Sequence, residues 1–418
     1  MQKKVLVLAY NDNSMDGHAF SVYKLLKENG YEACFLSMYS FYQDDESLKF
    51  FFKRSEQGIR RIGYNWYRLK RRLFSLTQRN TAVPGTEKEY CLFNVNNFFA
   101  HGAKDILKKC PYTPDIIVLG WVEHFISPKT IYDLYQLTKA QIIINMVDAH
   151  ITGGGCHFPC ECKQYMTGCH SCPAVINKKY PERLFAEKNK YLKDIPLTLV
   201  GVPYDLERAK LTPFLRNKKM VPYIGTPFIP FVKSKEEARK ELGIPEDDFV
   251  IMSGSAYIKE KRKGFHYLEQ ALKKFGSLYK GNRCVTFLQL GKNSDKTIDL
   301  GDKINIVQPG YLDLDGVFTA FYASDVFCNT PIDDSGPYMI NYSIACGTPV
   351  LSFPIGIATT LVKHGETGYM AKYMDVNDLV NGLQQFYAYT KDQYKSYEIN
   401  CRELMDYYRN QPAWYNTL

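Results

Sequence analysis

The sequence predicts an α/β protein built from two Rossmann-like, doubly wound domains. Three observations predict this fold. The chain has 418 residues, more than one domain usually holds. In both halves, short unbroken apolar runs alternate with helix-length segments, a pattern typical of parallel strands that helices cover on both faces. A stretch dense in proline and glycine over residues 221–230 interrupts the series and indicates a domain boundary near residue 228.

The first half opens with a strand over residues 5–10. The helix that follows, over 20–28, ends at Asn29-Gly30, which is a C-cap signal. Three more buried strands are predicted at 115–119, 141–145 and 197–201. These elements define an N-terminal domain over residues 1–227.

The second half repeats the alternation and predicts a second doubly wound sheet. A helix over 235–242 leads into strands at 249–252, 285–290, 304–307, 325–328 and 350–353. We expect a C-terminal domain over 228–395. Residues 396–418 are predicted to form a C-terminal helix, with packing back on the N-terminal domain as one option.

Composition narrows the classes of function. The formal charge of +9 suits an anionic ligand or surface. No run approaches the roughly 20 apolar residues of a membrane-spanning helix, so we expect a cytoplasmic protein or one peripheral to the inner face of the cytoplasmic membrane. Neither half has the Gly-x-Gly-x-x-Gly of a dinucleotide oxidoreductase. We expect no nucleic-acid partner, and a disulfide framework is not expected from the twelve cysteines.

The most informative stretch covers residues 329–353. A polar loop follows a predicted strand and leads into a predicted helix at 338–346. The carboxyl ends of parallel strands are where α/β proteins bind ligands, and a helix N-terminus favours a phosphate. The candidate ligand residues in this stretch are Asp333, Asp334, Ser335, Gly336, Pro337, Tyr338 and Asn341.

A second candidate segment follows the first strand of the same half. Gly254 and Ser255 precede a run of basic residues over 259–263, and Lys263-Gly264 closes the run. Such a run is often only a solvated face. Its position at a strand end favours a second interpretation, in which backbone amides and cations bind one anion.

Together these segments resemble the donor site of family-four glycosyltransferases of the GT-B fold, whose two Rossmann-like domains face across a cleft. The sequence Ile344-Ala-Cys-Gly-Thr-Pro-Val350 matches the end of the family motif, and the likeness extends over 245–390. The resemblance implies a retaining, metal-independent glycosyltransferase of the hexosyltransferase type. Its partners would be a UDP- or GDP-sugar donor and a saccharide or lipid-linked acceptor, and no cofactor would be required for catalysis.

The resemblance also implies roles for single residues. Asp333 takes the place of the acid that contacts the donor sugar, with Asp334 as the alternative, and Asn341 replaces the acid that binds the ribose. Lys263 fits the cation that binds the diphosphate. The family's other cation, an arginine, is absent, so Arg262, Lys261 or Lys259 would supply the second charge. Because both acids are altered, a protein that binds a nucleotide sugar without transfer is an alternative, as is a GT-B epimerase.

A cysteine-rich insert over 150–173 resembles a segment of a subset of these enzymes associated with extracellular polysaccharide assembly. Asp148 matches a catalytic candidate there, but Val147 stands where the subset has histidine, and His150 is a conceivable replacement. Five cysteines lie within 17 residues. They form either a cluster of packed thiols or a structural zinc site. The candidate zinc ligands are Cys156, Cys169, Cys172 and either Cys160 or Cys162, with His157 as an alternate.

The other acceptor-side candidates follow strands of the N-terminal sheet. Asp16, Gly17 and His18 come after the first strand, and Glu123 and His124 come after the strand at 115–119. Both sets are expected at the same edge of the predicted sheet as Asp148. A glycine at such a turn or a polar pair at a helix start is also common without any function.

A basic segment over residues 49–79 stands apart. It holds ten basic residues and one acidic residue, with aromatic residues between them. One interpretation is a solvated excursion of the N-terminal domain whose aromatics lie in the core. The other is peripheral contact with an anionic membrane, where each basic residue contributes on the order of 1 kcal/mol.

Overall fold

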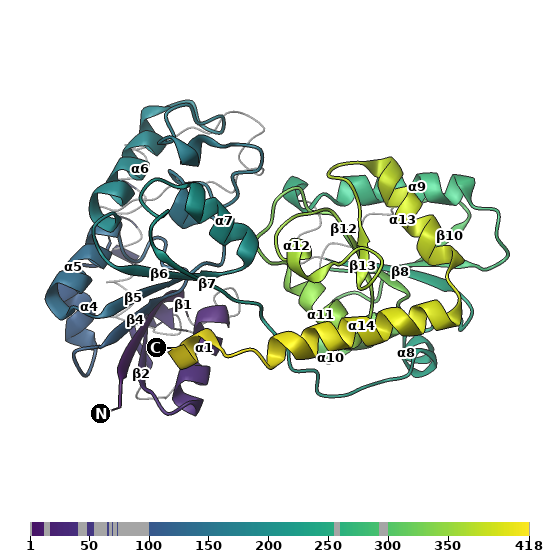
Figure 1. The fold of residues 1–418 in the computed structure, drawn as a ribbon, viewed down its shortest axis with the longest axis horizontal. Helices are drawn as coiled ribbons and strands as arrows, with labels where there is room; N and C mark the ends of the chain where they lie inside the picture. Colours follow the sequence, from purple (N-terminus) through teal and green to yellow (C-terminus); the bar gives the residue numbers. More distant parts are fainter. Residues whose placement is uncertain are drawn as a thin grey trace. The chain divides into compact units, whose positions relative to one another are not determined.

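The computed structural model describes residues 2–11, 17–40, 48–53, 65, 66, 69, 73, 100–254, 260–291 and 300–417. The chain divides into two compact units (Figure 1). The first unit comprises Met1–Tyr223 together with Ala413–Leu418, and the second comprises Ile224–Pro412. The division at Tyr223 falls inside the proline- and glycine-rich stretch of the sequence.

The first unit is built on a parallel sheet of seven described strands in the order β3-β2-β1-β4-β5-β6-β7. The strands are β1 Lys4–Asn11, β2 Glu32–Ser40, β3 Leu48–Lys53, β4 Ile116–Leu119, β5 Gln141–Asn145, β6 Leu197–Gly201 and β7 Lys219–Pro222. The helices are α1 Gly17–Glu28, α4 Ala103–Lys109, α5 Pro128–Thr138, α6 Lys179–Leu192 and α7 Pro203–Leu211.

Helices cover both faces of this sheet because its strands are apolar on both sides. In β1, Leu6 and Leu8 join the core beneath α4, α5 and α6, whereas Val5 and Val7 join the core beneath α1. Side chains alternate along a strand, so an unbroken apolar run supplies two cores at once. This arrangement confirms the doubly wound architecture that the apolar runs predict.

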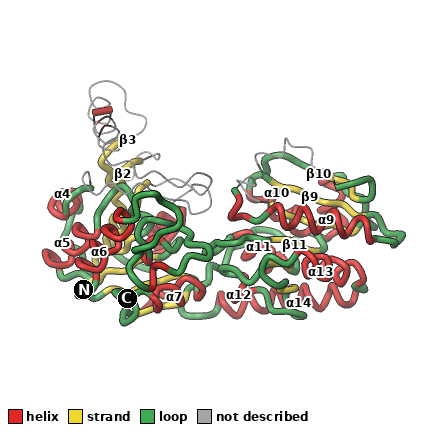
Figure 2. The backbone as a smooth tube through the Cα atoms, turned by 90° about the horizontal axis from the view of Figure 1, so that it is seen from above, coloured by secondary structure: helices red, strands yellow, loops and turns green. Residues whose placement is uncertain are grey.

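The second unit contains a parallel sheet of six described strands in the order β10-β9-β8-β11-β12-β13. The strands are β8 Phe249–Gly254, β9 Val285–Leu290, β10 Ile304–Val307, β11 Val326–Asn329, β12 Val350–Ser352 and β13 Gly368–Met370. The helices are α8 Lys235–Leu242, α9 Phe265–Leu278, α10 Leu314–Ala323, α11 Tyr338–Cys346, α12 Ala358–Leu361, α13 Val376–Ala388 and α14 Lys391–Arg409. Within this unit α9 packs beside α13, as Figure 2 shows, and α11 packs beside α14.

All strands predicted from apolar runs are present, which confirms the fold class. Four strands were not predicted: β2, β3, β7 and β13. The last two are only four and three residues long, and β7 is an edge strand whose residues are only partly buried or exposed. Pairing with the rest of the sheet, rather than a local apolar run, defines such strands.

The C-terminal helix differs from its predicted extent. Helix α14 begins at Lys391, after a capping box in which Thr390 caps the helix, and it belongs to the second unit. Of the residues after it, Ala413–Leu418 belong to the first unit. There Trp414 is buried in the core beside α1, and the carbonyl of Tyr415 accepts a hydrogen bond of 2.8 Å from the Tyr31 hydroxyl.

The basic segment over 49–79 is described only in part. Its first residues form β3, where Phe51 and Phe52 pack against the core of the first unit, as the excursion interpretation expects for aromatics. Arg68, Lys70, Arg71 and Arg72, which carry much of its charge, lie outside the described residues. In the part of the chain that the structure describes, no helix is both long and apolar enough to span a membrane.

Candidate functional site

The donor-side candidates of the second unit meet where β8 and β11 end. After β8, a short 3-10 turn, η4 Lys261–Lys263, leads to Gly264, whose φ is 63°. A Cβ on Gly264 would lie 1.7 Å from the carbonyl oxygen of Thr330, the residue after β11. Only glycine permits this approach. The Lys263-Gly264 pair thus brings the basic run directly against the polar loop before α11.

Asp334 binds both cations of that run. Its Oδ2 accepts hydrogen bonds of 2.5 Å from Lys263 Nζ and 3.2 Å from Arg262 Nη1, and its Oδ1 accepts one of 3.0 Å from the amide of Ser335. Burial acts to raise the pKa of Asp334, but the charges of Lys263 and Arg262 outweigh it and lower the pKa. Glu260 also pairs with Arg262, at 2.9 Å, so two cations and two carboxylates form one ion-paired cluster.

Three other predicted donor-site residues near Asp334 are buried, namely Asp333, Ser335 and Asn341. Asp333 is fully buried, and the hydroxyl of Ser335 is buried with no hydrogen-bond partner. The Asn341 amide donates a hydrogen bond of 2.6 Å to the carbonyl of Gly225. Asn341 therefore ties α11 to the first residues of the second unit, a role that the sequence did not indicate.

Backbone packing shapes the same loop. Gly356 has a φ of 58°, and a Cβ there would lie 2.5 Å from the carbonyl oxygens of both Asp334 and Ser335. Pro337 occupies the N-cap position of α11 with no side-chain cap, so the first amides of the helix lack a capping side chain. Such amides, together with Lys263 and Arg262, suit an anion.

Gly254 has a structural reason to be glycine. It ends β8, and a Cβ there would lie 2.8 Å from the Cβ of Leu290 on β9. Close packing of two strands therefore explains this residue without a ligand. Ser255 lies outside the described residues.

In the first unit, a carboxylate and histidine cluster lies where β4 and β5 end. His150 Nε2 lies 2.6 Å from Glu123 Oε1, and the His150 amide donates a hydrogen bond of 2.8 Å to Asp148. The other oxygen of Asp148 pairs with His157 Nδ1. Two residues that the sequence placed after different strands, Glu123 and His150, are thus brought into direct contact.

Lys188 on α6 completes this cluster. It is 5% exposed, and its ammonium donates hydrogen bonds of 2.5 Å to the carbonyl of His150 and 2.8 Å to that of Gly153. Burial acts to raise the pKa of Glu123, but His150 and then Lys188 outweigh it and lower the pKa to about 2. Burial lowers the pKa of His150, despite the opposing charge of Glu123, and Lys188 lowers it further.

A small cavity of about 50 Å³ opens beside this cluster, lined by Trp121, Asn145, Asp148 and His150 among others. Both amide atoms of Asn145 and one carboxylate oxygen of Glu123 are buried with no hydrogen-bond partner. Buried polar groups are almost always satisfied in folded proteins. These atoms therefore offer a donor and acceptors to a bound hydroxyl or water.

The ligand atoms of Glu123, His150 and His157 lie within 4.8 Å of one another, the one such group of three found among the described residues. The geometry would admit a metal ion. The Lys188 ammonium, 3.4 Å from His150 Nε2, opposes a cation at that point. We interpret the group as hydrogen-bonded acid and base pairs.

Other predicted residues lie apart from this cluster. His124 has a φ of 61° and packs its ring near Tyr10 and Trp121, and it does not line the cavity. Asp16 lies outside the described residues, as do the side chains of Gly17 and His18, which begin α1. Val147, which replaces the expected histidine, is 37% exposed.

The sequence patterns did not indicate Lys188, Asn145 or the pairing of His157 with Asp148. Signals for two of them exist. Lys188 interrupts an apolar stripe at helical spacing, since Leu184 and Leu192 on either side are buried. Asn145 is the polar end of the apolar strand β5, at the edge where α/β sheets bind ligands.

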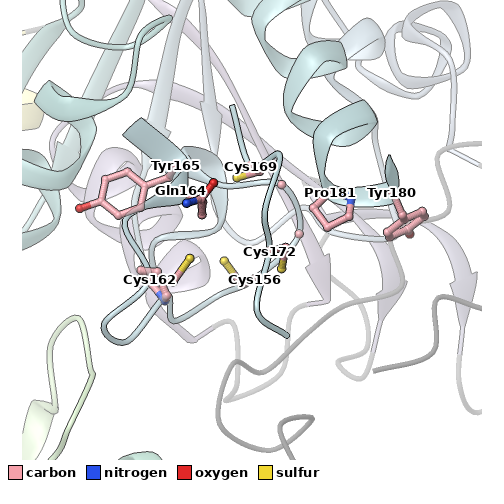
Figure 3. Close-up of a pocket in the computed structure, with 11 residues that line it drawn as sticks. Cys156, Cys162, Gln164, Tyr165, Cys169, Cys172, Tyr180 and Pro181 are labelled. Carbon is pink, nitrogen blue, oxygen red and sulfur yellow. The ribbon is translucent and has the colours of Figure 1, made fainter. Parts of the chain in front are cut away.

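The cysteine-rich insert forms a third candidate region. Cys156, Cys162, Cys169 and Cys172 line one small cavity, and Cys160 does not (Figure 3). The Cys160 thiol instead donates to the carbonyl of Phe158. The four cysteines that share the cavity thus include Cys162, the second of the two options that the sequence left open.

A family model matches most of the second unit. The sequence model described as glycosyl transferases group 1 matches residues 234–402. A curated relative, glycogen synthase of Thermosipho melanesiensis, is 24% identical over 242 residues, which are 56% of this chain and 48% of that protein. The chain therefore spans about half the length of this relative.

Solved structures extend the likeness in fold to both units. Sucrose-phosphate synthase of Thermosynechococcus elongatus matches with a TM-score of 0.62 at 14% identity, covering 97% of this chain and 94% of that one. HepE of Anabaena, solved with UDP and glucose, matches with a TM-score of 0.56 at 12% identity, covering 97% and 95%. The chain has the GT-B fold. Residues 234–402 of this fold match the model of glycosyl transferases group 1.

Proposed function

We propose that this chain is a retaining, metal-independent glycosyltransferase of the hexosyltransferase type. It transfers a sugar from a UDP- or GDP-sugar to a saccharide or lipid-linked saccharide. The observation that carries the proposal is the convergence of Lys263 and Arg262 on the loop before α11, inside the domain that matches glycosyltransferases. The HepE structure with UDP and glucose supports a nucleotide-sugar donor.

On the donor side, Lys263 and Arg262 bind the diphosphate together with the first amides of α11. When the bond to the sugar breaks, negative charge grows on the leaving diphosphate, and these cations stabilise it. Asp334 holds both cations in place before the donor binds. Asp333 contacts the sugar, and Asn341 offers its amide oxygen to the ribose while its nitrogen remains bonded to Gly225.

On the acceptor side, the cavity at the ends of β4 and β5 receives a hydroxyl of the acceptor. Carboxylates and amides are suitable partners for sugar hydroxyls because they accept and donate hydrogen bonds. Asp148, Glu123 and Asn145 supply such groups there, and His150 lies within the same cavity. We assign the acceptor hydroxyl to this cluster and keep Asp148 as its catalytic candidate.

We propose surface polysaccharide synthesis as the setting. The support is the segment over 148–173, which includes the cysteine-rich insert and resembles a segment of enzymes that build extracellular polysaccharides. The basic segment over 49–79 favours docking on an anionic membrane, where a lipid-linked acceptor would lie. Co-sedimentation with liposomes tests this docking. Binding should rise with anionic lipid and fall when Arg68, Lys70, Arg71 and Arg72 are changed to Glu; equal recovery on neutral liposomes would contradict it.

The decisive experiment measures binding of UDP and GDP by calorimetry, coupled to hydrolysis of the matching donors. Lys263→Ala should weaken binding of the preferred nucleotide about 10- to 150-fold, because a charged hydrogen bond to phosphate is lost. The matched control is Lys261→Ala. Lys261 is exposed two residues earlier and carries the same charge. Equal weakening in both variants would show that only general charge matters and would contradict the assigned site.

The same experiment weighs the alternative of a protein that binds nucleotide sugars without transfer. The complete burial of Asp333 favours this alternative, because the acid assigned to the donor sugar is not accessible in this conformation. Tight nucleotide binding with no donor hydrolysis and no transfer to any acceptor would support the binding protein.

A further inference from the structure

The cysteine cavity of the first unit lies outside the donor and acceptor sites and has a different chemistry. It measures about 20 Å³ and is lined by the four cysteines together with glycines, prolines and tyrosines. In Figure 3 the four cysteines surround the same space, with Cys156 between Cys162 and Cys172. All four are free thiols. A space of this size suits one small ion rather than an organic ligand.

The insert has little regular secondary structure, although Tyr165 and Cys169 belong to the main core of the first unit. Between β5 and α6 the chain forms only two 3-10 turns, η2 His150–Thr152 and η3 Gln164–Met166. Cys172 belongs to a separate apolar cluster with only two other members, Ala174 and Val175. Loops of this length without regular structure are uncommon in compact domains unless they have a function or another source of order.

The backbone of the insert also needs a restraint. Cys169 has a φ of 60° and Cys160 a φ of 49°, so both adopt the left-handed conformation that favours glycine. Each such residue costs on the order of 1 kcal/mol or more and persists only where its surroundings fix it. A cross-link through Cys169 would supply that restraint.

We propose that Cys156, Cys162, Cys169 and Cys172 bind one structural zinc ion. Four thiolates in tetrahedral arrangement are a preferred structural site for zinc, with Zn–S distances of about 2.3 Å. No three of these sulfurs lie within 4.8 Å of one another, so binding requires rotation of cysteine side chains toward the centre of the cavity. On binding, the four thiols release their protons to solvent and the ion takes their place.

Neighbouring contacts exclude the other candidate ligands. His157 does not line the cysteine cavity, and its ring pairs with Asp148 in the acceptor-side cluster. Cys160 points its thiol at the carbonyl of Phe158. The proposed zinc set therefore consists of sulfurs alone, and it takes Cys162 rather than Cys160, the two options that the sequence leaves open.

The proposed zinc site lies next in sequence to residues of the acceptor-side cluster. Cys156 immediately precedes His157, and Gly153 accepts a hydrogen bond from Lys188. A zinc ion held by Cys156 would fix the segment that presents His157 to Asp148. The ion thus organises the acceptor-side cluster from outside without contacting it.

The test is to measure the metal content of the purified full chain by elemental mass spectrometry. The expected result is one zinc ion per chain. Cys156→Ser and Cys172→Ser should each lose most of the zinc, and Cys160→Ser, the matched control from the same loop, should retain it. Because a variant can fail to fold, the wild type is also titrated with an organomercurial. Zinc release should then follow modification of thiols.

Cobalt substitution identifies the ligands. Co²⁺ at the proposed site should show the intense visible bands and the sulfur-to-metal charge transfer of tetrahedral thiolate coordination. A spectrum without thiolate bands would place the ion at Glu123, His150 and His157 and overturn the assignment. Absence of zinc from the wild type, loss of zinc in Cys160→Ser alone, or iron with acid-labile sulfide would overturn it as well.

Discussion

The two polar clusters of this protein differ in the kind of charge they hold. In the second unit, Asp334 pairs with the ammonium of Lys263 and the guanidinium of Arg262. In the first unit, the acids Glu123 and Asp148 pair with the imidazole rings of His150 and His157. Side-chain cations suit a diphosphate, whereas acids paired with imidazole rings suit a hydroxyl whose proton must move.

Burial separates the clusters further. Lys188 is 5% exposed, whereas the side chain of Lys263 is 21% exposed. An unpaired charge in the first cluster therefore cannot reach water easily, and one in the second can. Four variants or conditions sharpen this contrast.

Glu123→Gln should have the largest effect. Removing this charge leaves Lys188 and His150 buried beside a neutral amide, and breaking a buried charge pair costs about 3–5 kcal/mol. Urea unfolding should show that loss in free energy of unfolding. Asp334→Asn is the matched change in the second unit and should cost less, since Lys263 can turn to solvent. Equal losses would show that the two clusters do not differ in solvent access.

Asp333→Ala comes next in size and tests the donor side. We expect turnover to fall about 100-fold or more, the effect of removing one group that stabilises the transition state. Binding of the nucleotide diphosphate alone should change little, because this residue is assigned to the sugar. Steady-state kinetics and calorimetry give the two readings. If Asp334→Ala shows this pattern and Asp333→Ala does not, the sugar contact belongs to Asp334.

Asn341→Glu should cost about 1–3 kcal/mol of stability. The substitution removes the hydrogen bond to the Gly225 carbonyl and places a carboxylate near that oxygen. Thermal unfolding with and without UDP measures this loss of stability. Asn341→Ala is the control, because it deletes the bond without adding charge. A glutamate variant more stable than the alanine variant would argue against this repulsion.

Acidification should have the smallest effect. Burial lowers the pKa of His150 and lowers that of His101, also in the first unit, to about 4. The unfolded chain then binds more protons below about pH 6.5, so stability falls as the pH drops. Each histidine should remove less than about 1 kcal/mol between pH 7 and 6.

The cluster around Asp334 should not change the free energy of unfolding between pH 7 and 6, because the lowered pKa keeps Asp334 ionised. Urea unfolding at the two pH values checks the slope. His101→Phe should remove the part of the pH dependence of unfolding free energy that His101 contributes. An unchanged pH dependence in that variant would contradict the lowered pKa of His101.

The sequence alone determined the architecture of this protein. Unbroken apolar runs specify strands covered on both faces, and caps such as Ser234 before α8 and Gly243 after it mark helix ends through local hydrogen bonds. These signals act over a few residues, so they can be read along the chain. The donor loop before α11 is of this kind, since strand, polar loop and helix follow each other directly.

Only the tertiary structure decided which polar residues meet. Lys188 reaches His150 from a helix 38 residues away, and Asn341 reaches Gly225 across 116 residues. Between Cys160 and Cys162, the sequence favours neither, because backbone conformation decides which thiol faces the cavity. Local patterns reflect hydrogen bonds and burial within one element, whereas these contacts depend on how several elements pack, and no short stretch of sequence records that.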